Sequence, residues 1–110
     1  MQIKIYYYGY KVYQTGRTLN VELHQMRYFQ CVARYESVSK AADELHVSQS
    51  ALSKSISKLE NELGVKLFDR RGKRISINEN GLRFQQDVVR ILDDIDSSIE
   101  SLQGYSQQEQ

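Results

Sequence analysis

The chain has 110 residues, enough for one small domain and some additional segments. Its formal net charge of +1 at pH 7 indicates no particular partner, and its single cysteine, Cys31, excludes an internal disulfide and is typical of a reducing cytoplasm. No apolar run is long enough for a membrane span and no signal peptide is evident, so we expect a cytoplasmic protein that does not bind membranes.

Residues 1–20 differ in composition from the rest of the chain. Tyrosines and glycines are crowded in this segment: Tyr6, Tyr7, Tyr8, Gly9, Tyr10, Tyr13 and Gly16. Enrichment in aromatic and β-branched residues favours a strand or an irregular arm over a helix. We therefore interpret residues 1–20 as an N-terminal extension.

A helix is predicted over residues 22–35, where apolar side chains recur at helical spacing. Its core stripe is Leu23, Met26, Phe29, Val32 and Ala33. Arg27 lies off this stripe and could reach a phosphate. Cys31 has no His, Lys or second Cys at a useful spacing, so we interpret it as a small, semi-buried residue rather than a reactive thiol.

The next two helical patterns form a helix-turn-helix. Glu36 and Ser37 end the preceding helix, and Ser39 is the predicted cap of the following one. The two apolar stripes are Val38, Ala41, Ala42 and Leu45, and then Leu52, Ile56, Leu59 and Leu63. The paired alanines let the second helix cross the first closely. Ser48 is a good N-cap for the second helix, and Gly64 suits its left-handed end.

The other face of the second helix carries short polar and basic side chains. They are Gln49, Ser50, Ser53, Lys54, Ser57 and Lys58. In the major groove of DNA, Gln can pair with adenine, Ser can bond base edges or phosphate, and Lys can reach guanine or phosphate. Taken alone, these residues fit equally well a solvated face of a small helical bundle.

A basic hairpin follows. The period changes to alternation in residues 66–70 and 74–77, which flank a turn at Arg71, Gly72 and Lys73. Leu67, Ile75 and Ile77 can pack on the helices. The cations near the tip are Arg70, Arg71, Lys73 and Arg74, which favour phosphate or minor-groove contact. A hairpin in this place is the wing of a winged helix-turn-helix; the alternative is a loop kept soluble by its charge.

A long helix is predicted over residues 79–103, capped by Asn78 and followed by a disordered tail at 104–110. Its apolar seam is Phe84, Val88, Leu92, Ile95, Ile99 and Leu102, spaced mostly as in a coiled coil. The small domain cannot bury all of this seam. It therefore predicts a partner helix, most simply the same helix of a second subunit.

Charge is distributed unevenly along the chain. Residues 48–74 hold seven basic and three acidic side chains, whereas from residue 79 onward two arginines oppose seven acids. A basic surface followed by an acidic helix fits a DNA-binding protein, because the polyanion would repel the second segment.

The motifs LHQMRYF (23–29), SKAADELHVSQSALSKSISKLENELGVKLFDR (39–70) and INENG (77–81) resemble the DNA-binding domain of LysR-type transcriptional regulators. The family often has Pro at the position of Ser50 and Arg at that of Lys54. Since lysine lacks the two-pronged guanidinium fork, base contact at Lys54 is less secure than phosphate contact. The resemblance covers residues 23–81 and implies a winged domain at residues 21–78.

The resemblance also implies how the protein works. The helix at 79–103 would be a linker helix that pairs antiparallel into a dimer, with higher oligomers in the full-length protein. The dimer would bind an interrupted inverted repeat in double-stranded DNA. The resemblance implies a further ligand-sensing domain, so we expect a truncated form that does not respond to an inducer. It also places the natural start at Val21, with residues 1–20 an upstream extension or a remnant of expression; the alternative is a basic arm that touches DNA through Lys4, Lys11 and Arg17.

We therefore predict a DNA-binding protein that is mainly α, not an enzyme, and has no cofactor or metal. His24 and His46 lack metal-ligand spacing, and no phosphate loop or nucleophile elbow is present. Gln49, Ser50, Ser53 and Lys54 are the expected base or close groove contacts. The expected phosphate contacts are Ser39, Lys40, Ser48, Ser57, Lys58, Arg70, Arg71, Lys73 and Arg74. The alternatives are a protein–protein dimerisation module and a winged-helix regulator of another family, such as the multidrug-resistance repressor type.

Overall fold

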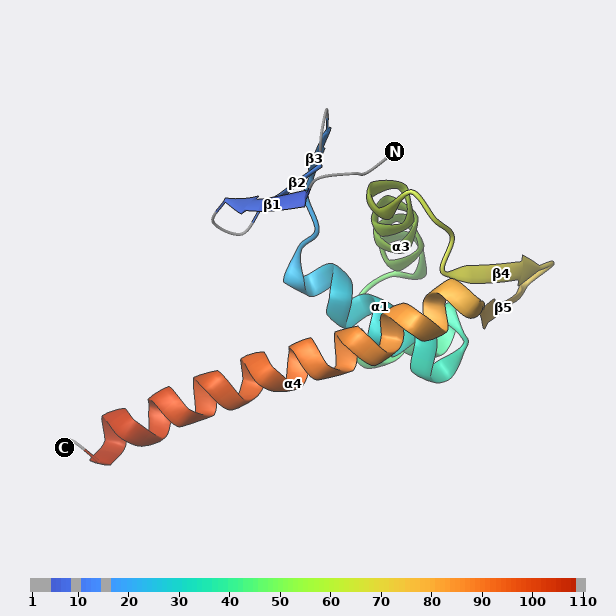
Figure 1. Ribbon diagram of the computed structural model, residues 1–110. Helices are drawn as coiled ribbons and strands as arrows, with labels where there is room; N and C mark the ends of the chain where they lie inside the picture. The colour runs from blue at the N-terminus through green and yellow to red at the C-terminus, as the bar shows by residue number, and fades with distance from the viewer. Residues whose placement is uncertain (1–4, 9–10, 15–16, 109–110) are drawn as a thin grey trace.

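The computed structural model describes the backbone of residues 5–8, 11–14 and 17–108, and the side chains of residues 19–104. Its elements in chain order are β1 (Ile5–Tyr8), β2 (Lys11–Gln14), β3 (Arg17–Leu19), α1 (Leu23–Tyr35), α2 (Val38–Leu45), α3 (Gln49–Leu63), β4 (Phe68–Arg71), β5 (Arg74–Ile77) and α4 (Glu79–Gln108). Helices α1, α2 and α3 pack on one another, and α4 crosses α1 and projects beyond it (Figure 1). The predicted fold class, mainly α with a small hairpin in a winged helix-turn-helix, is confirmed.

The first three strands form a small antiparallel sheet in the order β1-β2-β3. The sheet lies beside the start of α1 (Figure 1), and the backbone N–H of Asn20 donates to the Glu62 carboxylate at 3.2 Å. The prediction of a strand rather than a helix is confirmed. Lys4 and the side chains of Lys11 and Arg17 lie outside the described residues, so their contact with DNA stays a hypothesis.

The core is built around Phe29 of α1, which is fully buried. Its ring lies 5.6 Å from the ring of Phe68 in the wing and 5.1 Å from that of Phe84 in α4, measured between centroids. Leu52, Ile56 and Leu59 of α3 and Ala41 and Ala42 of α2 complete the packing. The predicted stripes are therefore largely correct.

The first helix contains one error of prediction. Leu23, expected in the core, is 40% exposed, whereas Gln25 is buried. The reason is a capping box: the Gln25 side chain accepts from the backbone N–H of Glu22 at 2.9 Å, and the Glu22 side chain accepts from the backbone N–H of Gln25 in return. Satisfying the helix start draws Gln25 inward, and Leu23 is left at the rim.

The helix-turn-helix has serine caps at both helices. Ser48 caps α3 as predicted, because its hydroxyl accepts from the backbone N–H of Ala51 at 3.0 Å. The cap of α2 is Ser37, not the predicted Ser39: the Ser37 hydroxyl accepts from the backbone N–H of Lys40 at 3.1 Å, and Ser39 is already helical. His46 makes the turn in a left-handed conformation, and Gly64 ends α3 at φ 74° as predicted.

The predicted hairpin is confirmed with different bounds: β4 begins at Phe68 rather than Lys66, and Arg71 belongs to the strand rather than to the turn. Strands β4 and β5 pair from Phe68 opposite Ile77 to Arg71 opposite Arg74, which leaves a two-residue turn at Gly72 and Lys73. Gly72 has φ 60°, the left-handed conformation that favours glycine. Leu67 and Ile75 are buried as expected, and so is Phe68, which the sequence analysis did not assign to the core.

The base of the hairpin is tied to the start of α4. Asn78 caps α4 as predicted, since its side-chain oxygen accepts from the backbone N–H of Gly81 at 2.9 Å, and its amide donates to the Lys66 carbonyl at 3.0 Å. A Cβ on Gly81 would clash with the Leu67 carbonyl oxygen and come within 2.5 Å of the Ile77 side chain. Only glycine fits this close approach of helix and wing.

Helix α4 departs from the prediction in two ways. It continues to Gln108 rather than ending at 103, so most of the predicted tail at 104–110 is helical; residues 109–110 lie outside the described residues. Val88 and Leu92 are buried in the chain's own core, and Phe84 packs against it. These three residues, predicted as dimer interface, therefore belong to the monomer, because α4 first covers α1. Ile99 (48% exposed) and Leu102 (70% exposed) remain open beyond it.

None of the described helices is long and apolar enough to cross a membrane.

Candidate nucleic-acid interface

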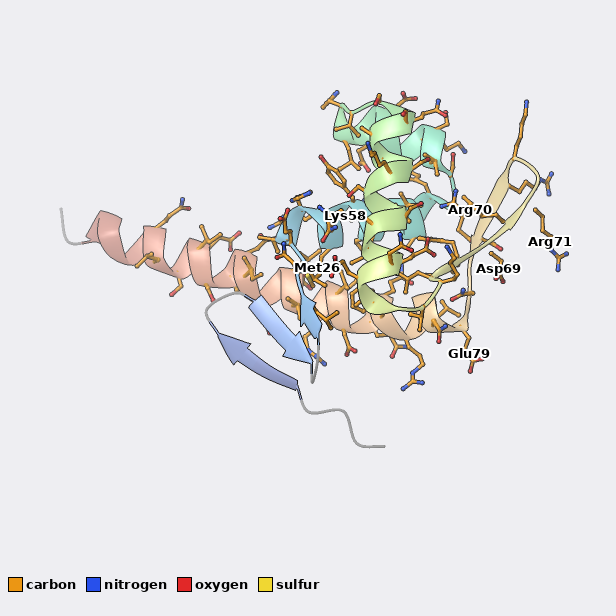
Figure 2. All side chains as sticks on the ribbon, turned by 90° about the horizontal axis from the view of Figure 1, so that it is seen from above. Met26, Lys58, Asp69, Arg70, Arg71 and Glu79 are labelled. Atoms are coloured by element: carbon orange, nitrogen blue, oxygen red, sulfur yellow. The ribbon has the colours of Figure 1, made fainter. Side chains whose placement is uncertain are left out.

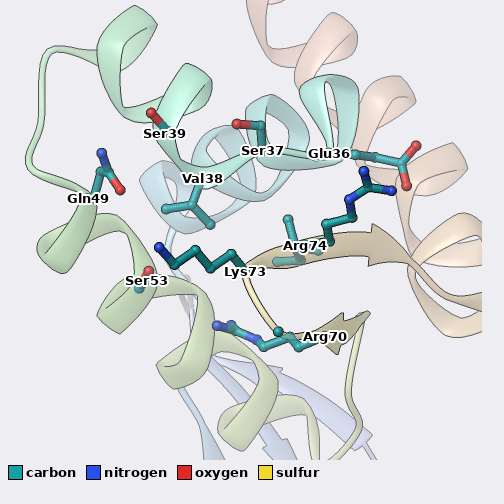
Figure 3. Close-up of a pocket in the computed structure, with 11 residues that line it drawn as sticks. Glu36, Ser37, Val38, Ser39, Gln49, Ser53, Arg70, Lys73 and Arg74 are labelled. Carbon is teal, nitrogen blue, oxygen red and sulfur yellow. The ribbon is translucent and has the colours of Figure 1, made fainter.

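A groove of about 560 Å³ opens where the start of α2, the first half of α3 and the wing converge (Figure 3). Its lining joins three segments that are distant in sequence: Glu36, Ser37, Val38, Ser39, Gln49, Ser53, Arg70, Gly72, Lys73, Arg74 and Ile75. Six predicted contact residues, Ser39, Gln49, Ser53, Arg70, Lys73 and Arg74, therefore line one concave surface. The tertiary structure brings them together although more than thirty residues separate the first from the last.

The wing supplies the positive charge of this groove. In Figure 3 the Lys73 side chain extends toward Gln49 and Ser53 of α3, and Arg70 points toward the same helix. Arg71 lies on the outer side of the hairpin (Figure 2), as expected for neighbouring residues of a strand. Within the described side chains, none of the ion pairs involves a wing cation. Their charge is therefore available to an anionic ligand.

The polar face of α3 divides between this groove and a second depression. Gln49 and Ser53 face the wing, whereas Lys54 and Lys58 line a hollow of about 310 Å³ with His24 of α1. Lys54 and Lys58 are exposed, as are Ser48 and Ser50, while Ser53 and Ser57 are half-buried. Lys40 is exposed on α2. The basic and polar face of the helix thus wraps around its solvent side.

The serine caps keep one hydrogen-bonding function free. Because the oxygens of Ser37 and Ser48 accept from backbone N–H groups, each hydroxyl hydrogen can still be donated outward. Both caps lie at helix N-termini, where backbone N–H groups and the helix dipole favour anions. The starts of α2 and α3 are therefore suited to hold phosphates.

Two polar residues of the groove lining, Ser37 and Glu36, are not predicted from the sequence. The local pattern favours Ser39 over Ser37 as the cap of α2. No local pattern links Glu36 to the wing, because the two come together only in the folded chain. Arg27, expected to be free for a phosphate, instead pairs with Asp96 of α4 at 3.0 Å and helps hold that helix against α1.

Cys31 is a structural residue, as predicted. It is buried, and its thiol donates to the Glu44 carboxylate at a sulfur–oxygen distance of 3.1 Å. Burial, together with this hydrogen bond and the negative charge of Glu44, raises the pKa of Cys31 to about 11. The same carboxylate raises the pKa of Tyr35, and the pKa of Glu44 is lowered by its bonds to both groups. A thiol held in its neutral form is a poor nucleophile.

Comparison with known proteins identifies the family. The family model for bacterial regulatory helix-turn-helix proteins of the lysR family matches residues 23–82, more than half of the chain. The chain belongs to this family. Similar proteins include the uncharacterized HTH-type transcriptional regulator YybE of Bacillus subtilis, 44% identical over 84 residues that make up 76% of this chain and 29% of YybE. The RuBisCO operon transcriptional regulator of Allochromatium vinosum is 38% identical, over 80% of this chain and 30% of that protein.

Solved structures of LysR-family DNA-binding domains share the fold. The complex of the BenM DNA-binding domain with catB site 1 DNA superimposes with a TM-score of 0.77 at 31% identity, covering 82% of this chain and 97% of that chain. The DNA complex of the CbnR DNA-binding domain gives 0.73 at 32% identity, covering 78% and 99%. Full-length BenM is matched over 26% of its length. The LysR-family chain thus spans less than a third of the length of YybE, the RuBisCO operon regulator and full-length BenM.

Proposed function

We propose that this LysR-family chain is the sequence-specific DNA-binding part of a bacterial transcriptional regulator. In this proposal α3 enters the major groove and the wing, residues 66–77, contacts the backbone or minor groove of double-stranded DNA. The carrying observation is the groove itself, where the wing cations, which form no ion pair with any of the described side chains, face the polar start of α3. The solved DNA complexes of similar BenM and CbnR domains support it.

The residues divide into two roles. Gln49, Ser50, Ser53 and Lys54 lie on the first half of α3 and are our candidates for base-edge or close groove contacts. The remaining candidates position the duplex through its phosphates: Ser39, Lys40, Ser48, Ser57, Lys58, Arg70, Arg71, Lys73 and Arg74. Ser37 joins this second group because its hydroxyl lines the same groove.

We also propose that the chain acts as a homodimer through the outer part of α4. Ile99 and Leu102 are exposed, Ile95 is half-buried, and a helix with such an edge is stabilised by an apolar partner. Antiparallel pairing of two copies places one winged domain on each half of an interrupted inverted repeat. Such a regulator works in the cytoplasm and has no enzymatic role; any inducer binds outside these 110 residues.

The test is selection from a pool of random-sequence duplexes at two salt concentrations, read by fluorescence anisotropy. Enrichment of an inverted repeat, with affinity that falls steeply as salt rises, is the expected result. A variant with Arg70, Lys73 and Arg74 replaced by Gln should lose most of the affinity, whereas replacement of Arg34, Arg83 and Arg90, which lie outside the groove, should have little effect. A dimeric sample that binds no DNA would instead support the protein-interaction module.

A further inference from the structure

Glu36 has an unusual backbone conformation at the edge of the groove. It ends α1 at φ 45° and ψ 41°, and its N–H bonds the Val32 carbonyl at 2.7 Å. This left-handed conformation disfavours residues that carry a Cβ, and glycine would adopt it without cost. His46 is the other described residue of this kind. The backbone conformation alone would therefore favour glycine, not glutamate, at position 36.

A hydrogen bond made by the Glu36 side chain explains why a glutamate is suited to this position. Its carboxylate accepts from the backbone N–H of Ile77 at 3.0 Å, across 41 residues of sequence. Ile77 is the last residue of β5 and pairs with Phe68 at the base of the wing. The bond therefore fastens the returning strand of the wing to the end of α1. On the other side of the hairpin, Glu60 of α3 accepts from the backbone N–H of Leu67, just before β4, at 2.7 Å.

The two carboxylates differ in their surroundings. Glu60 is 3% exposed and lies within the core, whereas Glu36 is exposed and lines the groove. Glu36 and Arg74 both line this groove (Figure 3). No ion pair between the two is formed among the described side chains. A negative charge in this groove opposes the approach of a polyanion.

We infer that Glu36 is a positioning residue of the proposed DNA interface, with two opposite effects. Its carboxylate oxygen, acting through Ile77, holds the wing at the place where Arg70, Lys73 and Arg74 line the groove. Its negative charge lowers the affinity for DNA. The inference rests on the proposed function for the second effect only, because the first is a property of the free protein.

Three substitutions of Glu36 separate these effects. Glu36→Gln keeps a side-chain oxygen that can accept from Ile77 and removes the charge. Glu36→Ala removes both, and Glu36→Gly also relieves the left-handed backbone. The matched control is Asp43→Asn, which removes one exposed carboxylate from α2 outside the groove lining.

The first measurement is amide hydrogen exchange in the free protein. Glu36→Ala and Glu36→Gly should speed exchange at Ile77 about tenfold or more relative to amides of α3, and Glu36→Gln should leave it nearly unchanged. Unchanged exchange at Ile77 in both Ala and Gly variants would overturn the positioning role. This result does not depend on DNA.

The second measurement is affinity for mixed-sequence duplex DNA over a range of salt. Glu36→Gln should bind about threefold to tenfold more tightly than the native chain at low salt, with the gain shrinking as salt rises. Glu36→Ala should bind more weakly than Glu36→Gln, although both lack the charge. Equal affinities of the Gln and Ala variants, or a gain equal to that of Asp43→Asn, would overturn the inference. Absence of binding by the native chain would instead refute the proposed function.

Discussion

The carboxylate of Glu60 accepts a 2.7 Å hydrogen bond from the backbone N–H of Leu67, and both residues are buried. An acidic residue of α3 thus satisfies a buried N–H donor in the segment that leads into the wing. Because the segment between Gly64 and Leu67 is short, this bond sets how the wing leaves the helix. A buried N–H without such a partner is costly.

We therefore expect Glu60→Leu to destabilise the fold by about 1–3 kcal/mol, since it leaves the Leu67 N–H buried and unsatisfied. Glu60→Gln, which retains an acceptor oxygen, should be the milder change. Urea unfolding followed by circular dichroism measures both. An unchanged free energy of unfolding in the Leu variant would show that this hydrogen bond does not stabilise the fold.

Alanine substitutions in the apolar edge of α4 should change the stability of the folded chain by amounts that depend on their position along the helix. Leu92 is 8% exposed and packs in the core, so Leu92→Ala should destabilise the folded chain by about 2–5 kcal/mol. Leu102 is 70% exposed, and Leu102→Ala should change monomer stability by less than about 0.5 kcal/mol.

Substitutions in the exposed part of α4 should affect dimerisation rather than the stability of the monomer. Ile99→Asp combined with Leu102→Asp should convert a dimer to a folded monomer, because both side chains are exposed in the monomer and desolvated in the proposed dimer. Sedimentation equilibrium gives the mass, and circular dichroism confirms the fold. A dimer that persists in the double variant would place the interface elsewhere.

Lys54 tests the reading role of α3. It is exposed on the first half of the helix, beside Lys58 and away from the wing groove. If Lys54 contacts a base, Lys54→Ala should cost about 1–3 kcal/mol of binding free energy on the selected operator and relax the preference at one position. A uniform loss on all sequences, with a shallower salt dependence, would assign it to phosphate. Arg83→Ala, which removes a cation outside the wing and outside both hollows, is the control.

Cys31 should be slow to react and should link stability to alkaline pH. With a pKa of about 11 in place of the usual 9.0, its thiolate fraction at pH 8 is lower by about 100-fold, and the thiol is buried, so disulfide exchange with an aromatic disulfide should be much slower than for an exposed cysteine. Glu44→Gln, which removes the negative charge beside the thiol, should speed the reaction.

The raised pKa of Cys31 also predicts how the free energy of unfolding changes with pH. The folded state holds the thiol proton more tightly than the unfolded chain does, so this stabilisation is complete below pH 9 and is lost as pH rises toward 11. Cys31→Ala should therefore flatten the decline of unfolding free energy over this interval. An equal decline in both proteins would assign the alkaline transition to other groups, Tyr35 among them.

The helices, caps and turns could be predicted because each depends on residues that are close in sequence. The helical stripes, the Ser48 cap, the left-handed Gly64 and the glycine turn of the wing each depend on a few neighbouring residues, and each was predicted. Errors arose where two local solutions compete. Ser37 and Ser39 are both plausible caps of α2, and the choice fell to Ser37 because Glu36 turns left-handed just before it.

The sequence by itself determined the winged helix-turn-helix and the family, and it supplied most of the candidates for the proposed interface, because periodicity, caps and charge are properties of neighbouring residues. Only the tertiary structure decided which half of the α4 seam is covered, since Val88 and Leu92 are buried by a helix distant in the chain. It alone also showed that Glu36 and Glu60 fasten the wing through Ile77 and Leu67. Burial and long-range hydrogen bonds depend on which surfaces pack together in the folded chain. Because these surfaces come from residues that are distant in sequence, no local sequence pattern predicts them.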